Sequence, residues 1–99
     1  MDIRNEFRRL SDEDYNYELF KFEHVENKLS TRPDLCAFLL LDQLVPGTKD
    51  MIPCAEHDEI WLAVDIDALG AVATEADVLT LVRCGVRFDS GNDSLAMFV

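Results

Sequence analysis

Positive charge is scarce in this chain of 99 residues. Nine lysines and arginines face 20 aspartates and glutamates, which gives a formal net charge of −11. Binding to nucleic acids depends largely on cations that neutralise phosphates, and anionic membrane surfaces attract basic segments. The charge balance therefore argues against a general DNA or RNA binder and against docking on such a membrane. It favours a partner with a basic surface, or it serves only solubility, and the sequence leaves both interpretations open.

Long apolar runs are missing too. No segment approaches the ~18 consecutive apolar residues of a transmembrane helix, and Met1–Glu6 lacks the apolar core of a signal peptide. The cysteines number three, at positions 36, 54 and 84. An odd number without a signal peptide predicts reduced thiols and a cytoplasmic location. Cys36 and Cys84 lie in apolar helical patterns, where cysteine usually acts as a small buried hydrophobic residue.

Signatures of catalysis and of cofactor binding are also missing. The chain contains no GxGxxG, Walker glycine loop, HExxH or EF-hand loop. The densest group of potential metal ligands is Cys54, Glu56, His57, Asp58 and Glu59. Zinc uses such ligand types, but their spacing matches no paired-ligand motif, so we expect neither a metal nor another cofactor. A small metal- or thiol-dependent enzyme that uses the Cys54–Glu59 loop remains an alternative, with Cys54 paired to His57 or His24 in the thiol case.

Length and composition predict a single small α+β domain over residues 1–99. Its first helix is expected over residues 2–10, where Ile3, Phe7 and Leu10 recur at helical spacing. Three arginines at positions 4, 8 and 9 share this segment. They either contact an anion or an acidic partner, or they pair with nearby carboxylates, as short basic clusters on solvated faces often do.

A second helix is expected after Ser11–Asp14, because serine can cap a helix and acids in the first turn complement the helix dipole. Its apolar positions would run from Tyr15 to Leu29. Alternation over residues 15–19 also fits a strand, which is the competing prediction. Four aromatic residues fall between positions 15 and 22. We interpret most of them as core, with an interaction surface as the alternative.

The most apolar helix is predicted over residues 34–44, with Thr31 as a possible cap and Pro46-Gly47 as the stop signal. Because it is apolar nearly all round, we expect it to be the buried central helix. A polar connector, Thr48–Asp58, follows it.

The last 41 residues, Glu59–Val99, carry most of the strand-like sequence. The patterns predict a strand over 60–64, helices over 66–72 and 75–84, and a hairpin of 86–88 with 95–99. Thr74 begins a capping pattern for the second of these helices and Gly85 fits its end. The segment Leu95–Val99 is expected to be a free sheet edge, through which a homodimer could form.

The order helix 34–44, strand 60–64, helices 66–72 and 75–84, then hairpin resembles that of winged helix-turn-helix domains. The resemblance implies that helix 75–84 reads the DNA major groove, with Ser90–Asp93 as the wing. Here the exposed positions of that helix would be Glu75, Asp77, Thr80 and Arg83, and both surfaces are neutral to acidic. A winged-helix DNA-binding regulator, with the arginines at 4, 8 and 9 on phosphates, is therefore an alternative function.

The function that these patterns favour is a small, acidic, non-enzymatic protein-binding module that regulates or inhibits a partner with a basic surface. A partner that itself binds nucleic acid is a natural candidate. Small acidic inhibitors of nucleases or polymerases, including those of phages and other mobile elements, have this physical profile. The expected partner-binding residues are acids exposed on the last 35 residues: Asp65, Asp67, Glu75, Asp77, Asp89 and Asp93.

Overall fold

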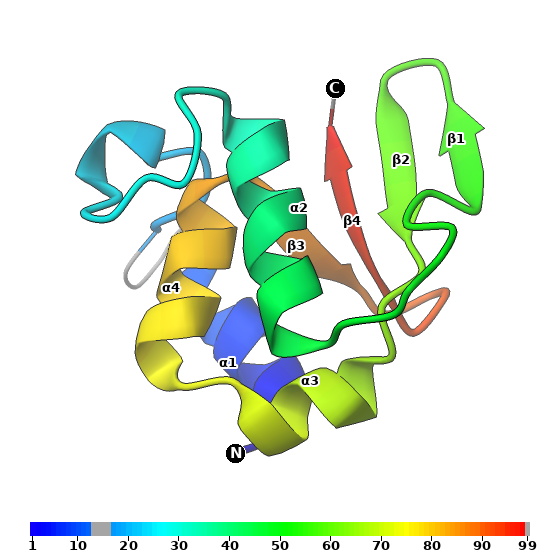
Figure 1. Ribbon diagram of the computed structural model, residues 1–99. Coiled ribbons are helices and arrows are strands. Elements are labelled where there is room, and N and C mark those ends of the chain that lie inside the picture. The colour runs from blue at the N-terminus through cyan, green and yellow to red at the C-terminus, as the bar shows by residue number, and fades with distance from the viewer. Residues whose placement is uncertain (13–16, 99) are drawn as a thin grey trace.

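The computed structural model describes residues 1–12 and 17–98 of the chain (Figure 1). Within these residues lie four α-helices, one 3₁₀ turn and a four-stranded antiparallel sheet. Their order is α1 (Ile3–Leu10), η1 (Phe22–His24), α2 (Pro33–Leu44), β1 (Cys54–Glu56), β2 (Glu59–Leu62), α3 (Ile66–Val72), α4 (Glu75–Arg83), β3 (Val86–Asp89) and β4 (Ser94–Phe98). The α+β prediction is confirmed, and the order from α2 onward is compatible with that of winged-helix domains. No helix in the described part of the chain is long and apolar enough to cross a membrane.

The sheet has the strand order β1-β2-β4-β3, so the last strand of the chain lies inside it. Strand β4 pairs with β2 on one side, from Glu59 opposite Phe98 to Leu62 opposite Leu95. On its other side it pairs with β3. The prediction of a free edge over Leu95–Val99 is therefore wrong for residues 95–98, because both backbone edges of this strand are already paired. Val99 lies outside the described residues.

One face of the sheet forms the core together with the helices. On β2, β3 and β4, strand alternation places Ile60, Leu62, Val86, Phe88, Leu95 and Met97 on this face, and all but the partly buried Phe88 are buried. Helices α1 and α4 pack against β3, and α1 buries the three side chains of its predicted stripe. The helix expected over residues 2–10 is thus confirmed. Its three apolar side chains lie on one face, and that face packs into the core.

On the opposite face of the sheet, side chains of β2 and β3 contact each other across β4. Trp61 on β2 donates a hydrogen bond from Nε1 to the Asp89 carboxylate on β3, at 2.9 Å. Arg87 on β3 forms an ion pair with Glu59 on β2. Both contacts span the intervening strand β4, where Ala96 is fully buried although it lies outside the core cluster. A small residue at this central position leaves room for the long side chains that reach across it.

The end signals predicted for α4 are confirmed, and α3 is capped as well. Asp65 caps α3 by accepting hydrogen bonds from the backbone N–H groups of Asp67 and Ala68. Thr74 and Asp77 form a reciprocal capping box at the start of α4. Gly85 ends α4 with φ of +102°, a left-handed conformation that favours glycine.

The helix predicted from Tyr15 to Leu29 is wrong in its described part, residues 17–29, and no strand replaces it there. Tyr15 itself lies outside the described residues. The only regular element of this stretch is the short η1. Backbone hydrogen bonds from Glu18 to Leu10 and from Phe20 to Val82 tie the segment to α1 and α4 instead. This irregular segment still buries Val25. Apolar residues at helical spacing were therefore not enough to predict a helix here.

Helix α2 forms where it was predicted, but it is not buried all round. It packs against α3 and α4 and buries Cys36, Ala37 and Leu41 on that side. Leu35 and Leu39 on the other side remain 43% and 45% exposed. The expectation of a buried central helix is wrong because its neighbours cover only one of its faces.

The start of α2 and the connector that follows it differ from prediction in detail. Arg32, not Thr31, occupies the N-cap position of α2, and no side-chain hydrogen bond caps the helix. The stretch Thr48–Asp58 is not wholly irregular, because its residues 54–56 form strand β1, which pairs with β2.

The capping box allows a test of local stability. Replacing Thr74 with alanine removes the acceptor for the Asp77 backbone N–H, so we expect the free energy of unfolding to fall by about 1 kcal/mol. The matched control is Thr31→Ala, at the position from which the sequence predicted a cap that the structure lacks. Urea unfolding followed by circular dichroism measures both. Equal losses in the two variants would contradict the assigned cap.

Candidate functional site

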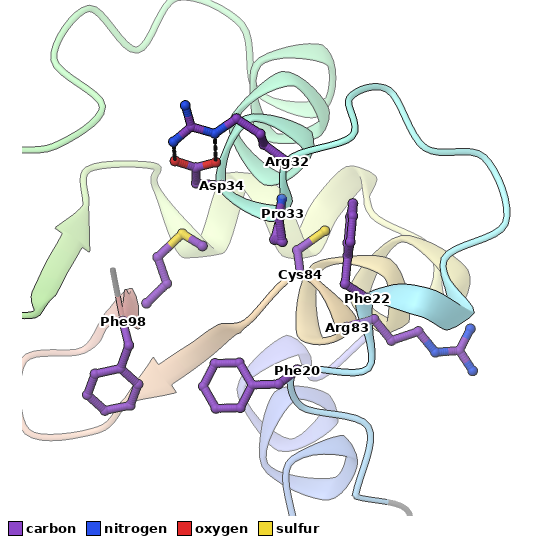
Figure 2. Close-up of a pocket in the computed structure, with 9 residues that line it drawn as sticks. Phe20, Phe22, Arg32, Pro33, Asp34, Arg83, Cys84 and Phe98 are labelled. Carbon is purple, nitrogen blue, oxygen red and sulfur yellow. Dashed lines mark hydrogen bonds and ion pairs between the residues drawn. The ribbon is translucent and has the colours of Figure 1, made fainter.

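A cleft of about 390 Å³ opens where four segments of the chain meet (Figure 2). These are the stretch around η1, the start of α2, the end of α4 and the end of β4. Its apolar lining consists of Phe20, Phe22, Pro33, Cys84, Met97 and Phe98. An apolar concavity of this size fits a buried anchor side chain or a small apolar molecule.

Two aromatic rings stand at the cleft with about half of their surface open to solvent. Phe20 is 50% and Phe98 is 47% exposed, and their ring centroids lie 6.3 Å apart. Figure 2 shows the two rings side by side at one end of the cleft. Exposed aromatic residues next to a pocket are typical anchors of protein interfaces.

The backbone of Phe20 is strained. Its φ of +68° places an aromatic residue in the left-handed region, which bulky side chains rarely adopt. The Phe20 ring lies against Gly85, where an added Cβ would come within 3.1 Å of the ring. Strain of this kind costs about 1–3 kcal/mol and concentrates at functional sites. The strained residue therefore points to the cleft as a candidate binding site.

The charged groups at the cleft are already neutralised. Arg32 donates to Asp34 from Nε and Nη2, at 3.2 and 2.9 Å, as the dashed lines in Figure 2 show. Arg83 donates from Nε to Glu18, at 3.0 Å, and from Nη1 to a backbone carbonyl. Each guanidinium thus already contacts a carboxylate of its own chain, and the rest of the cleft lining is mainly apolar.

Cys84 is a poor nucleophile in this setting. Its thiol is buried, and that burial, with the neighbouring Cys36 thiol as a smaller contribution, raises the pKa of Cys84 to about 12. At neutral pH it is therefore a protonated thiol, and the prediction that Cys36 and Cys84 are small buried hydrophobic residues is confirmed.

A larger hollow of about 470 Å³ lies between α2 and α4, but it is a weaker candidate. Its lining mixes polar and apolar side chains, and two of its charged residues already have partners. Asp77 belongs to the capping box and Arg83 to the ion pair with Glu18. Its described lining residues include no aromatic side chain, unlike those of the cleft.

The structure brings two of the expected partner-binding acids together around a single arginine. Arg4 on α1 contacts the Asp67 carboxylate at 2.8 Å and the Asp93 carboxylate at 2.7 Å. The hydrogen bond from Arg4 lowers the pKa of Asp93 below its ordinary value. This cluster ties the first helix to α3 and to the turn between β3 and β4.

The other four expected acids lie apart from this arginine. Asp89 accepts hydrogen bonds from Asn92 and Trp61, in that order of effect, and they lower the pKa of its carboxyl. Asp65 and Asp77 cap helices, as described above. Glu75 is exposed, and within the described residues it alone of the six has no such contact. A partner-binding role for the six acids stays a prediction, but five of them also hold the fold together.

The arginines near the N-terminus contact groups of their own chain. Arg9 pairs with Glu6, while Arg8 lies over the Phe88 ring at 5.2 Å and donates to Asn5. With Arg4 bound to two carboxylates, pairing within the chain is the interpretation that the structure confirms for Arg4 and Arg9.

The Cys54–Glu59 loop is a short hairpin and not a convergent site. Cys54 and Glu56 lie on β1, and His57 with Asp58 forms the exposed turn to β2. Among residues 1–12 and 17–98, no three His, Cys, Asp or Glu side chains gather where they could hold a metal ion.

Sequence reasoning missed the cleft because its residues come from four distant segments. The cluster of aromatic residues at 15–22 was the available signal, but it was assigned mainly to the core. Neither the left-handed backbone of Phe20 nor its contact with Gly85 can be recognised from the local sequence.

The contact between Phe20 and Gly85 can be measured by a double-mutant cycle. Gly85→Ala combines an unfavourable backbone conformation with a clash on the Phe20 ring, so we expect it to cost more than about 1 kcal/mol. In a Phe20→Ala background the clash disappears, and the cost should fall by at least about 0.5 kcal/mol. Gly47→Ala is the control, because Gly47 also has a positive φ but open space around a Cβ. An identical cost of Gly85→Ala in both backgrounds would argue against the assigned contact.

The Arg4 cluster predicts a dependence of stability on pH. Because the pKa of Asp93 is lowered in the folded state, its contribution is complete above its unfolded pKa of about 3.9 and is lost as the pH falls through the folded value. Asp93→Asn should therefore unfold at lower urea concentration at pH 7 and lose less stability between about pH 4 and pH 2. Asp58→Asn, on an exposed turn without an ion-pair partner, is the control. Parallel pH profiles for the wild type and Asp93→Asn would refute the assignment.

Comparison of the chain with protein-family models, with curated proteins and with solved structures finds no match. Function is therefore inferred from the contacts, exposure and charges of this chain alone.

Proposed function

We propose that this protein is a non-enzymatic protein-binding module that regulates or inhibits a partner with a basic surface. A partner that itself binds nucleic acid is the natural candidate, in the reducing environment of a cytoplasm. An origin in a phage or another mobile element fits this role.

The observation that carries the proposal is that the arginines are used inside the molecule. Each of the six arginines contacts a carboxylate, an amide or an aromatic ring of its own chain: Arg4, Arg8, Arg9, Arg32, Arg83 and Arg87. Few cations therefore remain for the phosphates of a nucleic acid, which weighs against direct DNA binding. The surface instead presents surplus carboxylates.

Apart from Glu75 on α4, these surplus carboxylates lie in two places. Besides Glu75, six exposed acids have no bonded partner within the described residues: Glu23, Glu26, Asp42, Asp50, Glu56 and Asp58. The first three lie around η1 and on α2, and the last three lie before and on the hairpin of β1 and β2. Unpaired charges of one sign attract a partner of the opposite sign and speed its association.

Glu56 lies near the exposed Phe98, whereas Asp50 lies towards the other end of β2, where the Ala63 backbone N–H donates to the Met51 carbonyl. Strand pairing places Phe98 opposite Glu59, and Glu59 in turn opposite Glu56. An apolar anchor in the cleft and cations opposite the hairpin would then engage neighbouring parts of one surface. We therefore assign the binding surface to the cleft with Phe20 and Phe98, flanked by the hairpin acids.

Two variants of equal charge test this assignment. Neutralising the hairpin acids (Asp50→Asn, Glu56→Gln, Asp58→Asn) should weaken partner binding about tenfold, because each exposed pair contributes up to about 1 kcal/mol. The control neutralises Glu23, Glu26 and Asp42 and gives the same net charge. The measurement is affinity capture from a lysate at about 50 and 150 mM salt with quantitative mass spectrometry.

A partner lost selectively from the hairpin variant, and held less firmly at the higher salt, is the expected result. Equal losses in both variants would mean that only net charge acts. Partner binding that changes neither with salt nor in either variant would refute the proposal. The acidity would then serve solubility alone.

A further inference from the structure

The outward face of α2 carries a stripe with an unusual order of side chains. Leu35, Leu39 and Asp42 follow one another at intervals of four and three residues, which places them on one side of α2, and Arg32 stands three residues before Leu35 at the N-cap. All four are exposed, and Leu35 and Leu39 account for two of the large apolar side chains open to solvent. Figure 1 shows α2 running beside α4, and the stripe lies on the side away from the buried residues of α2.

This stripe is complementary to itself. Its spacing is symmetric about Ala37, and its two ends carry opposite charges. Two copies of α2 can meet in antiparallel orientation around a two-fold axis that passes at the level of Ala37 along the helix. Leu35 then faces the partner's Leu39. The same operation sets Arg32 opposite the partner's Asp42. A parallel arrangement would place equal charges together, which is unfavourable.

Both charged ends have capacity for this contact. The two hydrogen bonds to Asp34 use Nε and Nη2 of Arg32, and its Nη1 has no partner in the described part of the chain. The Asp42 carboxylate likewise has no hydrogen-bond or ion-pair partner among the described residues. The end charges are thus available, and they match only in the antiparallel arrangement.

We propose that the protein forms an antiparallel homodimer through the Arg32–Asp42 stripe of α2. The dimer replaces the one expected from a free Leu95–Val99 edge, which the pairing of β4 removes. The stripe is about 15 Å long, so the interface is small and the dimer weak and rapidly exchanging. Because two chains of charge −11 repel each other, association should strengthen as salt screens them, opposite to binding of a basic partner.

The first test measures molar mass against concentration. Sedimentation equilibrium and light scattering of the wild type up to about 0.5 mM at physiological salt should show a monomer–dimer equilibrium. Leu39→Glu should weaken it at least about tenfold. Val72→Glu, at an exposed apolar position on α3, is the matched control and should leave it unchanged. A monomeric wild type, or equal effects of the two substitutions, would overturn the proposal.

The second test uses charge reversal and mixing. Arg32→Glu and Asp42→Arg each place two like-charged pairs across their own homodimer, so each variant alone should be monomeric. In a mixture, the heterodimer gains opposite charges at both ends, and the dimer should return. Circular dichroism confirms that the variants are folded. Failure of the mixture to dimerise, with both variants folded and the wild type dimeric, would exclude the antiparallel arrangement.

Discussion

The burial of Ala96 at the centre of strand β4 organises both faces of the sheet. Its neighbours in sequence, Leu95 and Met97, point into the core, while its own methyl group lies beneath side chains from the two flanking strands. Trp61 reaches Asp89 across β4 beside this small residue, and Arg87 reaches Glu59 over the Phe98 ring. The central strand thereby connects the hydrophobic core to a second, polar set of contacts.

Ion pairs extend this organisation to the rest of the chain. Arg4 joins α1 to two carboxylates that lie 63 and 89 residues further along the sequence. Arg83 similarly holds the irregular segment at Glu18 against the end of α4. The ion pairs of the described residues use arginines only, and several of them connect distant segments, which leaves more unpaired acids than the three lysines at the surface. The acidity of the surface is therefore partly a consequence of how the fold is held together.

The parts of the fold that sequence could predict are those with local causes. Thr74 and Asp77 lie within one turn, and Ile3, Phe7 and Leu10 repeat at the helical period, so the pattern alone identifies them. The order of strands was not accessible, because the pairing of Leu95 with Leu62 depends on segments far apart. The cleft was missed for the same reason, since the left-handed backbone of Phe20 is imposed by α4 and Gly85. Composition described the charge well, but not which carboxylates are bound to arginines.

Helix α2 shows why apolar composition does not equal burial. Its exposed leucines are on the side away from α3 and α4. They form an apolar surface that no other segment of the described chain covers. Arg32 belongs both to this stripe and to the rim of the cleft. A second copy seated on α2 would place its Asp42 next to that guanidinium, at the rim of the cleft that Phe20 and Phe98 also line. Self-association and partner binding would then compete for one edge of the molecule, and salt would shift the balance between them in opposite directions.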